Sequence, residues 1–106
     1  MTLREICIAA GVTRRAVQGY EKAGLAAPTG KTSRGYLLYD LEMQERIKMI
    51  RLYQQLGFSL KEIGEIIDAP NERKKMALQE REEKLKEKGV YIESLLNKAY
   101  ELIGTL

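Results

Sequence analysis

Two short helices joined by a tight turn are specified at the start of the chain, in the run TLREICIAAGVTRRAVQGYEKAG that begins at Thr2. Glu5 follows Thr2 at the spacing of a capping box, in which each residue bonds to the backbone of the other. Gly11 suits the left-handed position just past a helix end, and Thr13 can cap the next helix. Because these signals are local, the segment predicts a helix-turn-helix.

The second of these helices has an apolar side and a polar side when it is drawn at about 100° per residue. The inner side carries Ala16, Val17, Tyr20 and Ala23. The outer side carries Arg14, Arg15, Gln18, Gly19 and Lys22. Arginine and glutamine form bidentate hydrogen bonds with base edges in the major groove, and lysine pairs with phosphate. The outer side therefore indicates a DNA-binding surface, with an ordinary solvated helix face as the alternative.

The charge of the chain is unevenly distributed, although its net value of +3 is mild. Residues 1–39 contain six lysines and arginines against two glutamates, which gives +4. The other 67 residues contain twelve lysines and arginines against thirteen acidic residues, which gives −1. The basic excess lies in the N-terminal third, which suggests a polyanionic partner for that part of the chain.

Length and composition exclude several classes of protein. A chain of 106 residues suffices for one small domain. No apolar run approaches the roughly 18 residues that cross a membrane, and the N-terminus lacks the pattern of a signal peptide. Cys7 is the only cysteine, and the chain contains no histidine. We therefore expect a cytoplasmic protein without internal disulfide, metal ion, cofactor or catalytic activity.

Residues 25–39 lack helical periodicity. Three turn-forming residues interrupt them: Pro28, Gly30 and Gly35. Residues 36–39 are typical of a short strand, and residues 25–28 are expected to pair with it. Thr32, Ser33 and Arg34 would form the tip of this hairpin. Such a wing lies beside the sugar-phosphate backbone, so the hydroxyls of Tyr36 and Tyr39 are candidates for phosphate contacts. For Tyr39, a packing role is an equal alternative.

A third helix is expected from Asp40, which can cap it, to Leu56. A second capping box follows at Ser59 and Glu62 and begins a fourth helix. Lys61 lies in the first turn of that helix, where the positive end of the helix dipole disfavours a cation. An external anion such as a DNA phosphate would explain this lysine.

Residues 70–106 predict one long helix with an apolar stripe. The stripe has heptad spacing and widens toward the end, and it consists of Leu78, Leu85, Ile92, Leu95, Leu96, Ala99, Leu102 and Ile103. At about 1.5 Å per residue, this helix is too long to bury the stripe against a small domain, so a second copy of the chain is the expected partner. Gly89 leaves an alternative, in which the chain folds back on itself as a helical hairpin.

The chain resembles the MerR family of bacterial transcriptional regulators in three blocks, GVTRRAVQGYEKAGL, GYLLYD and QQLGFSLKEIGEII, followed by the long helix. The resemblance implies a mainly α fold, with a winged helix-turn-helix and a small β-hairpin wing over residues 1–69. Residues 70–106 would form a dimerisation helix that pairs as an antiparallel coiled coil. The resemblance also implies a homodimer that binds a palindromic site in double-stranded promoter DNA and distorts it to realign the promoter for RNA polymerase.

Two positions depart from the family pattern. The usual Arg-Tyr-Tyr of the recognition helix is Gln18-Gly19-Tyr20 here, and the usual arginine of the wing is Leu37. The cations expected to take over are Arg14, Arg15 and Arg34. The full set of expected DNA-binding residues is Thr13, Arg14, Arg15, Gln18, Gly19, Tyr20, Lys22, Arg34, Gly35, Tyr36, Tyr39, Ser59 and Lys61.

Two other functions compete with a promoter-binding dimer. An excisionase-like architectural DNA-binding protein shares the winged fold but has no need of a long dimerisation helix. A coiled-coil protein-interaction module needs no one-sided basic helix. The sequence does not identify the operator or an effector, and the cysteine ligands of the metal-sensing relatives are missing from the region of the long helix.

Overall fold

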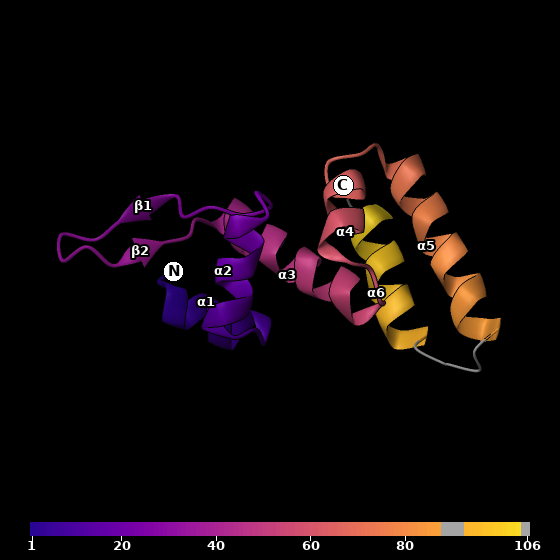
Figure 1. The fold of residues 1–106 in the computed structure, drawn as a ribbon, viewed down its shortest axis with the longest axis horizontal. Coiled ribbons are helices and arrows are strands. Elements are labelled where there is room, and N and C mark those ends of the chain that lie inside the picture. The colour runs from indigo at the N-terminus through magenta and orange to yellow at the C-terminus, as the bar shows by residue number, and fades with distance from the viewer. Residues whose placement is uncertain (88–92, 105–106) are drawn as a thin grey trace. The chain divides into compact units, whose positions relative to one another are not determined.

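The computed structural model describes residues 1–87 and 93–104, which pack as two compact units, Met1–Arg51 and Leu52–Leu106 (Figure 1). The elements are α1 (Leu3–Ala10), α2 (Arg14–Lys22), β1 (Gly30–Lys31), β2 (Leu37–Leu38), α3 (Leu41–Gln55), α4 (Leu60–Ile66), α5 (Asn71–Glu87) and α6 (Glu93–Gly104). This mainly helical chain with one small hairpin confirms the predicted fold class. Within the described residues, no helix is both long enough and apolar enough to cross a membrane.

The capping residues place α1 and α2 where the sequence predicts them. Thr2 Oγ1 accepts a hydrogen bond from the Glu5 backbone N–H at 3.3 Å, and Glu5 Oε1 accepts one from the Thr2 N–H at 3.0 Å. Gly11 ends α1 with a φ of 66°, in the left-handed region that a side chain disfavours. Thr13 Oγ1 then accepts from the Ala16 N–H at 3.0 Å and begins α2. The tight turn between the two helices follows from these local bonds.

The apolar sides of the first two helices supply the interior of the first unit. Ile6 of α1 and Val17 of α2 are both 0% exposed, and Tyr20 is 1% exposed. The other buried residues of this unit include Leu25, Ala26, Tyr39, Ile47 and Ile50. Burial of each large aliphatic side chain contributes about 1.5–3 kcal/mol relative to exposure.

The wing hairpin pairs different residues from those expected. The register sets Gly30 opposite Leu38 and Lys31 opposite Leu37. The predicted partner segment, residues 25–28, forms no strand. Instead, the Leu25 N–H bonds to the Tyr20 carbonyl at 2.9 Å, which continues the end of α2. Gly35, at a φ of 84°, donates its N–H to the Thr32 carbonyl at 2.9 Å and closes a shorter turn. The prediction was wrong because tertiary burial of Leu25 withdraws that segment from the hairpin.

The first residues of the chain pair with the base of the wing. Thr2 and Leu38 form an isolated antiparallel bridge. The Tyr39 N–H donates to the Met1 carbonyl at 2.7 Å, and the Met1 amino group donates to the Tyr39 carbonyl at 3.1 Å. These bonds fix the base of the wing against the start of α1.

In the second unit, α4 begins at the predicted capping box. Ser59 Oγ accepts from the Glu62 N–H at 3.1 Å, and Glu62 Oε1 accepts from the Ser59 N–H at 3.0 Å. The bonds to Ser59 lower the pKa of the Glu62 carboxyl, because they favour its charged form. Ile63 and Ile66 of this helix are 0% and 3% exposed, so the cap directs an apolar face into the interior.

Replacing Ser59 by alanine is expected to lower the free energy of unfolding by about 1 kcal/mol, because the hydroxyl that accepts the Glu62 N–H is lost. Urea unfolding followed by circular dichroism measures the change. Ser33→Ala, at an exposed position of the wing tip, is the matched control and should leave stability unchanged. Equal stability of the two variants would contradict the role of the cap.

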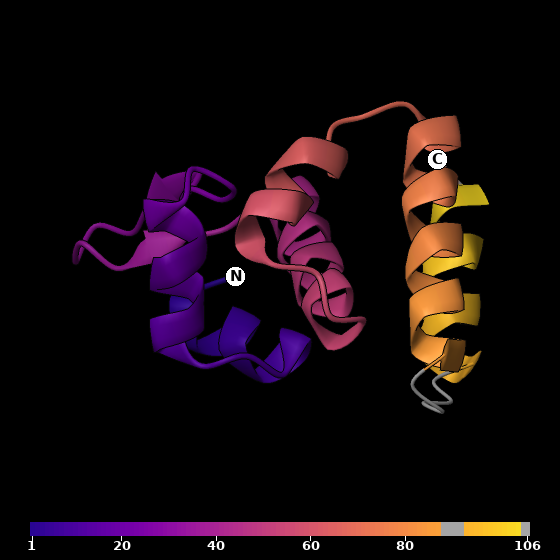
Figure 2. The same ribbon diagram turned by 45° about the vertical axis from the view of Figure 1, so that its right-hand side comes forward.

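The C-terminal region differs from the single long helix that the sequence predicts. The structure contains two helices, and α6 runs back along α5 (Figures 1 and 2). Leu78, Ala99 and Ile103 of the predicted stripe are each 0% exposed within one chain, and Leu85 is half-buried. The hairpin alternative therefore describes this region, because closing a short intrachain connection costs less entropy than recruiting a second molecule. Ile92, the side chains of Leu95, Leu96 and Leu102, and the proposed break at Gly89 lie outside the described residues.

Tyr53 carries a hydroxyl into the interior of the second unit. Its side chain is 0% exposed, and its ring meets Phe58 edge-on at a centroid distance of 5.5 Å. The hydroxyl has no hydrogen-bond partner among the described residues. Burial raises the pKa of Tyr53 from 10.0 to about 12, because the phenolate would lose its hydration.

Tyr53→Phe is expected to reduce the decrease in the free energy of unfolding that occurs as the pH becomes alkaline. Because the folded-state pKa is raised, the contribution of Tyr53 is complete below pH 10 and is lost as the pH rises toward about 12, by up to about 1.4 kcal/mol per pH unit. At neutral pH the change should stay below about 1 kcal/mol, since an unbonded hydroxyl is removed. Urea unfolding across this pH range tests the expectation, with exposed Tyr36→Phe as the control. An unchanged alkaline profile in Tyr53→Phe would refute it.

Candidate nucleic-acid interface

The outer side of α2 is a solvent-exposed basic surface, as its sequence predicts. Arg14, Arg15, Gln18 and Lys22 are exposed, whereas Val17 and Tyr20 are buried on the opposite side. Within the described part of the chain, the three cations of this surface have no ion-pair partner. Unpaired arginines on one helix face are available to base edges and phosphates. We call these four exposed residues the α2 basic surface.

Two small residues lie next to the α2 basic surface: Thr13 precedes it, and Gly19 lies within it. Thr13 is exposed but its hydroxyl caps α2. A Cβ built on Gly19 would meet no atom within 4 Å, so the position is open. Gly19 therefore leaves room for a DNA backbone or base edge close to the helix.

The wing presents further cations and one exposed aromatic ring. Lys31, Arg34 and Tyr36 are exposed, and Tyr36 has 64% of its surface accessible. The Tyr36 N–H donates to Thr32 Oγ1 at 3.1 Å, which orders the tip. Gly35 adopts its positive φ between these residues. This arrangement keeps the predicted residues Arg34, Gly35 and Tyr36 available to a ligand.

The structure assigns Tyr39 to packing rather than to the surface. Its side chain is 1% exposed, and its hydroxyl donates to Glu21 Oε1 at 2.6 Å. Burial and the neighbouring Glu21 carboxylate raise the pKa of Tyr39. The expected phosphate contact of Tyr39 is thus corrected: the hydroxyl serves the fold by joining the wing to α2. Tyr20 is 1% exposed, which agrees with its inward position on the helical wheel and leaves almost none of its side chain accessible for the expected DNA contact.

A groove lies at the junction of α1, α2 and the wing. Its volume is about 600 Å³, and it is lined by Thr2, Leu3, Arg4, Arg14, Gly35, Tyr36 and Leu37. Two arginines and no carboxylate line it. It therefore continues the positive charge of the α2 basic surface toward the wing.

The predicted contacts of the second unit are also accessible. Ser59 and Lys61 are exposed at the start of α4. The capping box already occupies the backbone N–H groups of Ser59 and Glu62, so the positive charge of Lys61 is the main attraction for an anion there.

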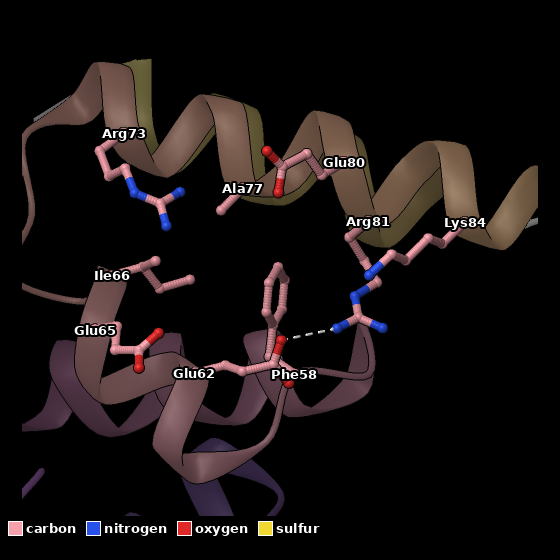
Figure 3. A pocket seen from close by; sticks show the side chains of 9 residues that line it. All are labelled: Phe58, Glu62, Glu65, Ile66, Arg73, Ala77, Glu80, Arg81 and Lys84. Atoms are coloured by element: carbon pink, nitrogen blue, oxygen red, sulfur yellow. Dashed lines mark hydrogen bonds and ion pairs between the residues drawn. The ribbon is translucent and has the colours of Figure 1, made fainter.

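A small pocket of about 70 Å³ between α4 and α5 has a different character (Figure 3). Arg81 Nη2 donates to Glu62 Oε2 at 3.2 Å, and its guanidinium lies 4.8 Å from the centroid of the Phe58 ring. The lining includes three basic residues and three glutamates. Because its charges balance, this pocket does not favour a polyanion, and Arg81 joins α5 to the start of α4.

Arg4 and Lys31 are exposed cations that the sequence argument left unassigned. Arg4 lies in the first turn of α1, where the helix dipole disfavours a cation, and this is the signal that singled out Lys61. The same reasoning applied to α1 would have identified Arg4. Lys31 had no such signal, because it lies inside the predicted hairpin, away from any helix end, and the observed register sets it in β1 opposite Leu37.

Comparison with known proteins shows which family the chain resembles. The sequence models for the MerR HTH family regulatory protein and for the MerR DNA-binding region match residues 1–70 and 44–106. The chain is 35% identical over 86 residues to the HTH-type transcriptional activator mta of Bacillus subtilis, covering 81% of this chain and 34% of mta. It is 42% identical over 64 residues to the nodulation protein NolA of Bradyrhizobium diazoefficiens, covering 60% of this chain and 27% of NolA.

The fold agrees with a solved relative as well. The crystal structure of MtaN, the N-terminus of the Bacillus subtilis multidrug transporter activator, superposes with a TM-score of 0.73 and 31% identity, covering 99% of this chain and 92% of MtaN. The matched part of the chain spans only 34% of the length of mta and 27% of the length of NolA. With a family model matching most of its residues, the chain belongs to the MerR family of helix-turn-helix regulatory proteins.

Proposed function

We propose that this chain acts as a homodimeric, sequence-specific transcriptional regulator that binds a palindromic promoter site. The observation that carries the proposal is the one-sided α2 basic surface, whose cations are exposed and unpaired in the described structure. Family membership supports it, because the matched relative mta is named a transcriptional activator.

In this proposal α2 enters the major groove and reads bases through Arg15 and Gln18. Arg15 lies in the first turn of α2 and Gln18 in the second, and both exposed side chains carry the hydrogen-bonding groups for bidentate contacts. Lys22 at the far end and Arg34 at the wing tip would contact phosphates and set the register.

A dimer would place two copies of α2 in successive major grooves, about 34 Å apart. The α5–α6 hairpin already buries Leu78, Ala99 and Ile103 within one chain. We infer that dimerisation exchanges α6 between two chains, because exchange re-forms the same buried contacts without requiring a new interface.

Distortion of the promoter is the proposed route to regulation. A dimer that contacts DNA phosphates through α2, the wing and Lys61 would stabilise a duplex that is bent or untwisted at its flexible steps. Such a change would realign promoter elements for RNA polymerase.

Selection of binding sites from a random duplex library, at a stated salt concentration, tests the proposal. Enrichment of one inverted repeat with fixed spacing is the expected result, and sedimentation equilibrium should show two chains per selected duplex. A single asymmetric site would favour the architectural alternative. Absence of any enrichment, with the protein folded, would reject sequence-specific binding and favour the protein-interaction alternative.

A further inference from the structure

We propose that the groove between α1, α2 and the wing holds the sugar-phosphate backbone of the bound duplex, with Arg4 and Arg14 as its phosphate ligands. The inference rests on the proposed DNA-binding function and deepens it. It adds Arg4 to the interface and assigns Arg14 to the backbone rather than to the bases.

The first support is the charge of the groove. Arg4 and Arg14 come from different helices and line the same cavity, and no acidic residue lines it. Both side chains are exposed, and within the described residues neither is engaged in an ion pair. Two unpaired guanidinium groups in one concavity favour an anion with several acceptor oxygens.

Glu5, the acidic residue next to Arg4 in the sequence, already accepts a backbone hydrogen bond. Glu5 Oε1 accepts the Thr2 N–H at 3.0 Å, as part of the capping box of α1. Hydrogen bonds to Thr2 also lower the pKa of Glu5, since they stabilise the carboxylate where it lies. Glu5 is therefore held at the helix end, and within the described residues it forms no ion pair with Arg4.

The second support is the way the groove is built. The bridge between Thr2 and Leu38 joins the start of α1 to β2, so two walls of the groove are held together by backbone pairing. Gly35, in the turn of the wing, also lines the groove and carries no side chain that would obstruct a DNA backbone. Tyr36, with 64% of its surface accessible, offers a hydroxyl donor at the rim.

The position of the groove fits a duplex better than a small ligand. Arg14 lines the groove and is also the first residue of the α2 basic surface, so the groove adjoins the N-terminal end of that surface. A recognition helix in the major groove, which is about 12 Å wide, has a phosphate strand beside each end. An open groove at the N-terminal end of α2 is placed to receive that strand.

The test measures binding of the full chain to two duplexes of equal length, the selected site and a scrambled sequence, across a range of salt concentrations. Arg4→Gln and Arg14→Gln should each weaken binding to both duplexes by a similar factor, roughly tenfold at moderate salt. Each should also reduce the slope of log K against log salt by about 0.9, the value for one lost phosphate contact. Arg4→Lys should retain most of the slope, because it retains the charge.

Arg73→Gln is the matched control. It removes an exposed arginine from α5 and should leave both affinity and slope at wild-type values. Wild-type affinity and slope in Arg4→Gln and Arg14→Gln would overturn the inference while leaving the proposed function intact. A loss confined to the selected site would also overturn it, since that result means base reading. Failure of the wild-type chain to bind either duplex would reject the proposed function itself.

Discussion

Replacing Leu78 by aspartate is expected to lower the free energy of unfolding of the second unit by about 4 kcal/mol or more, because an unpaired carboxylate would occupy an apolar interior. Leu78 is 0% exposed on α5. The helical circular-dichroism signal at 222 nm should fall by the fraction of the helical residues that belong to α5, with 17 residues, and α6, with 12 residues. Urea unfolding and circular dichroism measure both effects.

Met76→Asp is the control for this experiment, since Met76 lies two residues away on the same helix with 54% of its surface exposed. It should change stability by less than about 0.5 kcal/mol. The two variants also test the proposal that α6 is exchanged between the two chains of the dimer. If Met76→Asp keeps the fold but dissociates the dimer in sedimentation equilibrium, the exposed side of α5 forms the interface and the exchange proposal is wrong.

Arg15→Ala is expected to weaken binding to the selected DNA site by about 5- to 150-fold, which corresponds to the 1–3 kcal/mol of a bidentate base contact. Binding to scrambled duplex should weaken far less, because that binding depends on phosphates. Arg15 is exposed in the first two turns of α2, so its loss should leave the fold intact. Fluorescence anisotropy at one fixed salt concentration compares the two duplexes.

Two comparisons make the Arg15 result specific. Arg73→Ala removes an arginine from α5 and should match the wild-type chain on both duplexes. An equal loss on the selected and the scrambled duplex for Arg15→Ala would instead show that Arg15 contacts phosphate only. The specificity would then have to come from Gln18 or from the shape of the DNA.

Much of the fold was predictable because its determinants are local. The hydroxyls of Thr2, Thr13 and Ser59 each bond within three residues along the chain, so their spacing in the sequence is sufficient to place the helix starts. The polar and apolar sides of α2 follow from helical periodicity, and the exposure of Arg15 confirms it. A periodic pattern and a cap need no knowledge of the rest of the molecule.

The candidate site was only partly predictable, because it combines residues that are distant in sequence. The residue pair Arg4 and Arg14 shares a groove with Tyr36 only because β2 pairs with the start of the chain. Tyr39 is a candidate for phosphate contact by its position in the wing, yet its hydroxyl bonds to Glu21, 18 residues earlier. No short-range pattern encodes either arrangement.

The sequence by itself determined the helix-turn-helix, its basic surface and the caps, since each depends on interactions within about one helical turn. Tertiary structure decided three other features: the register of β1 with β2, the burial of Tyr39, and the return of α6 along α5. The heptad stripe predicts packing against a partner helix but does not identify that helix. Leu78, Ala99 and Ile103 are buried within one chain because an apolar surface packs against whichever complementary surface is nearest, and here α5 and α6 belong to the same molecule.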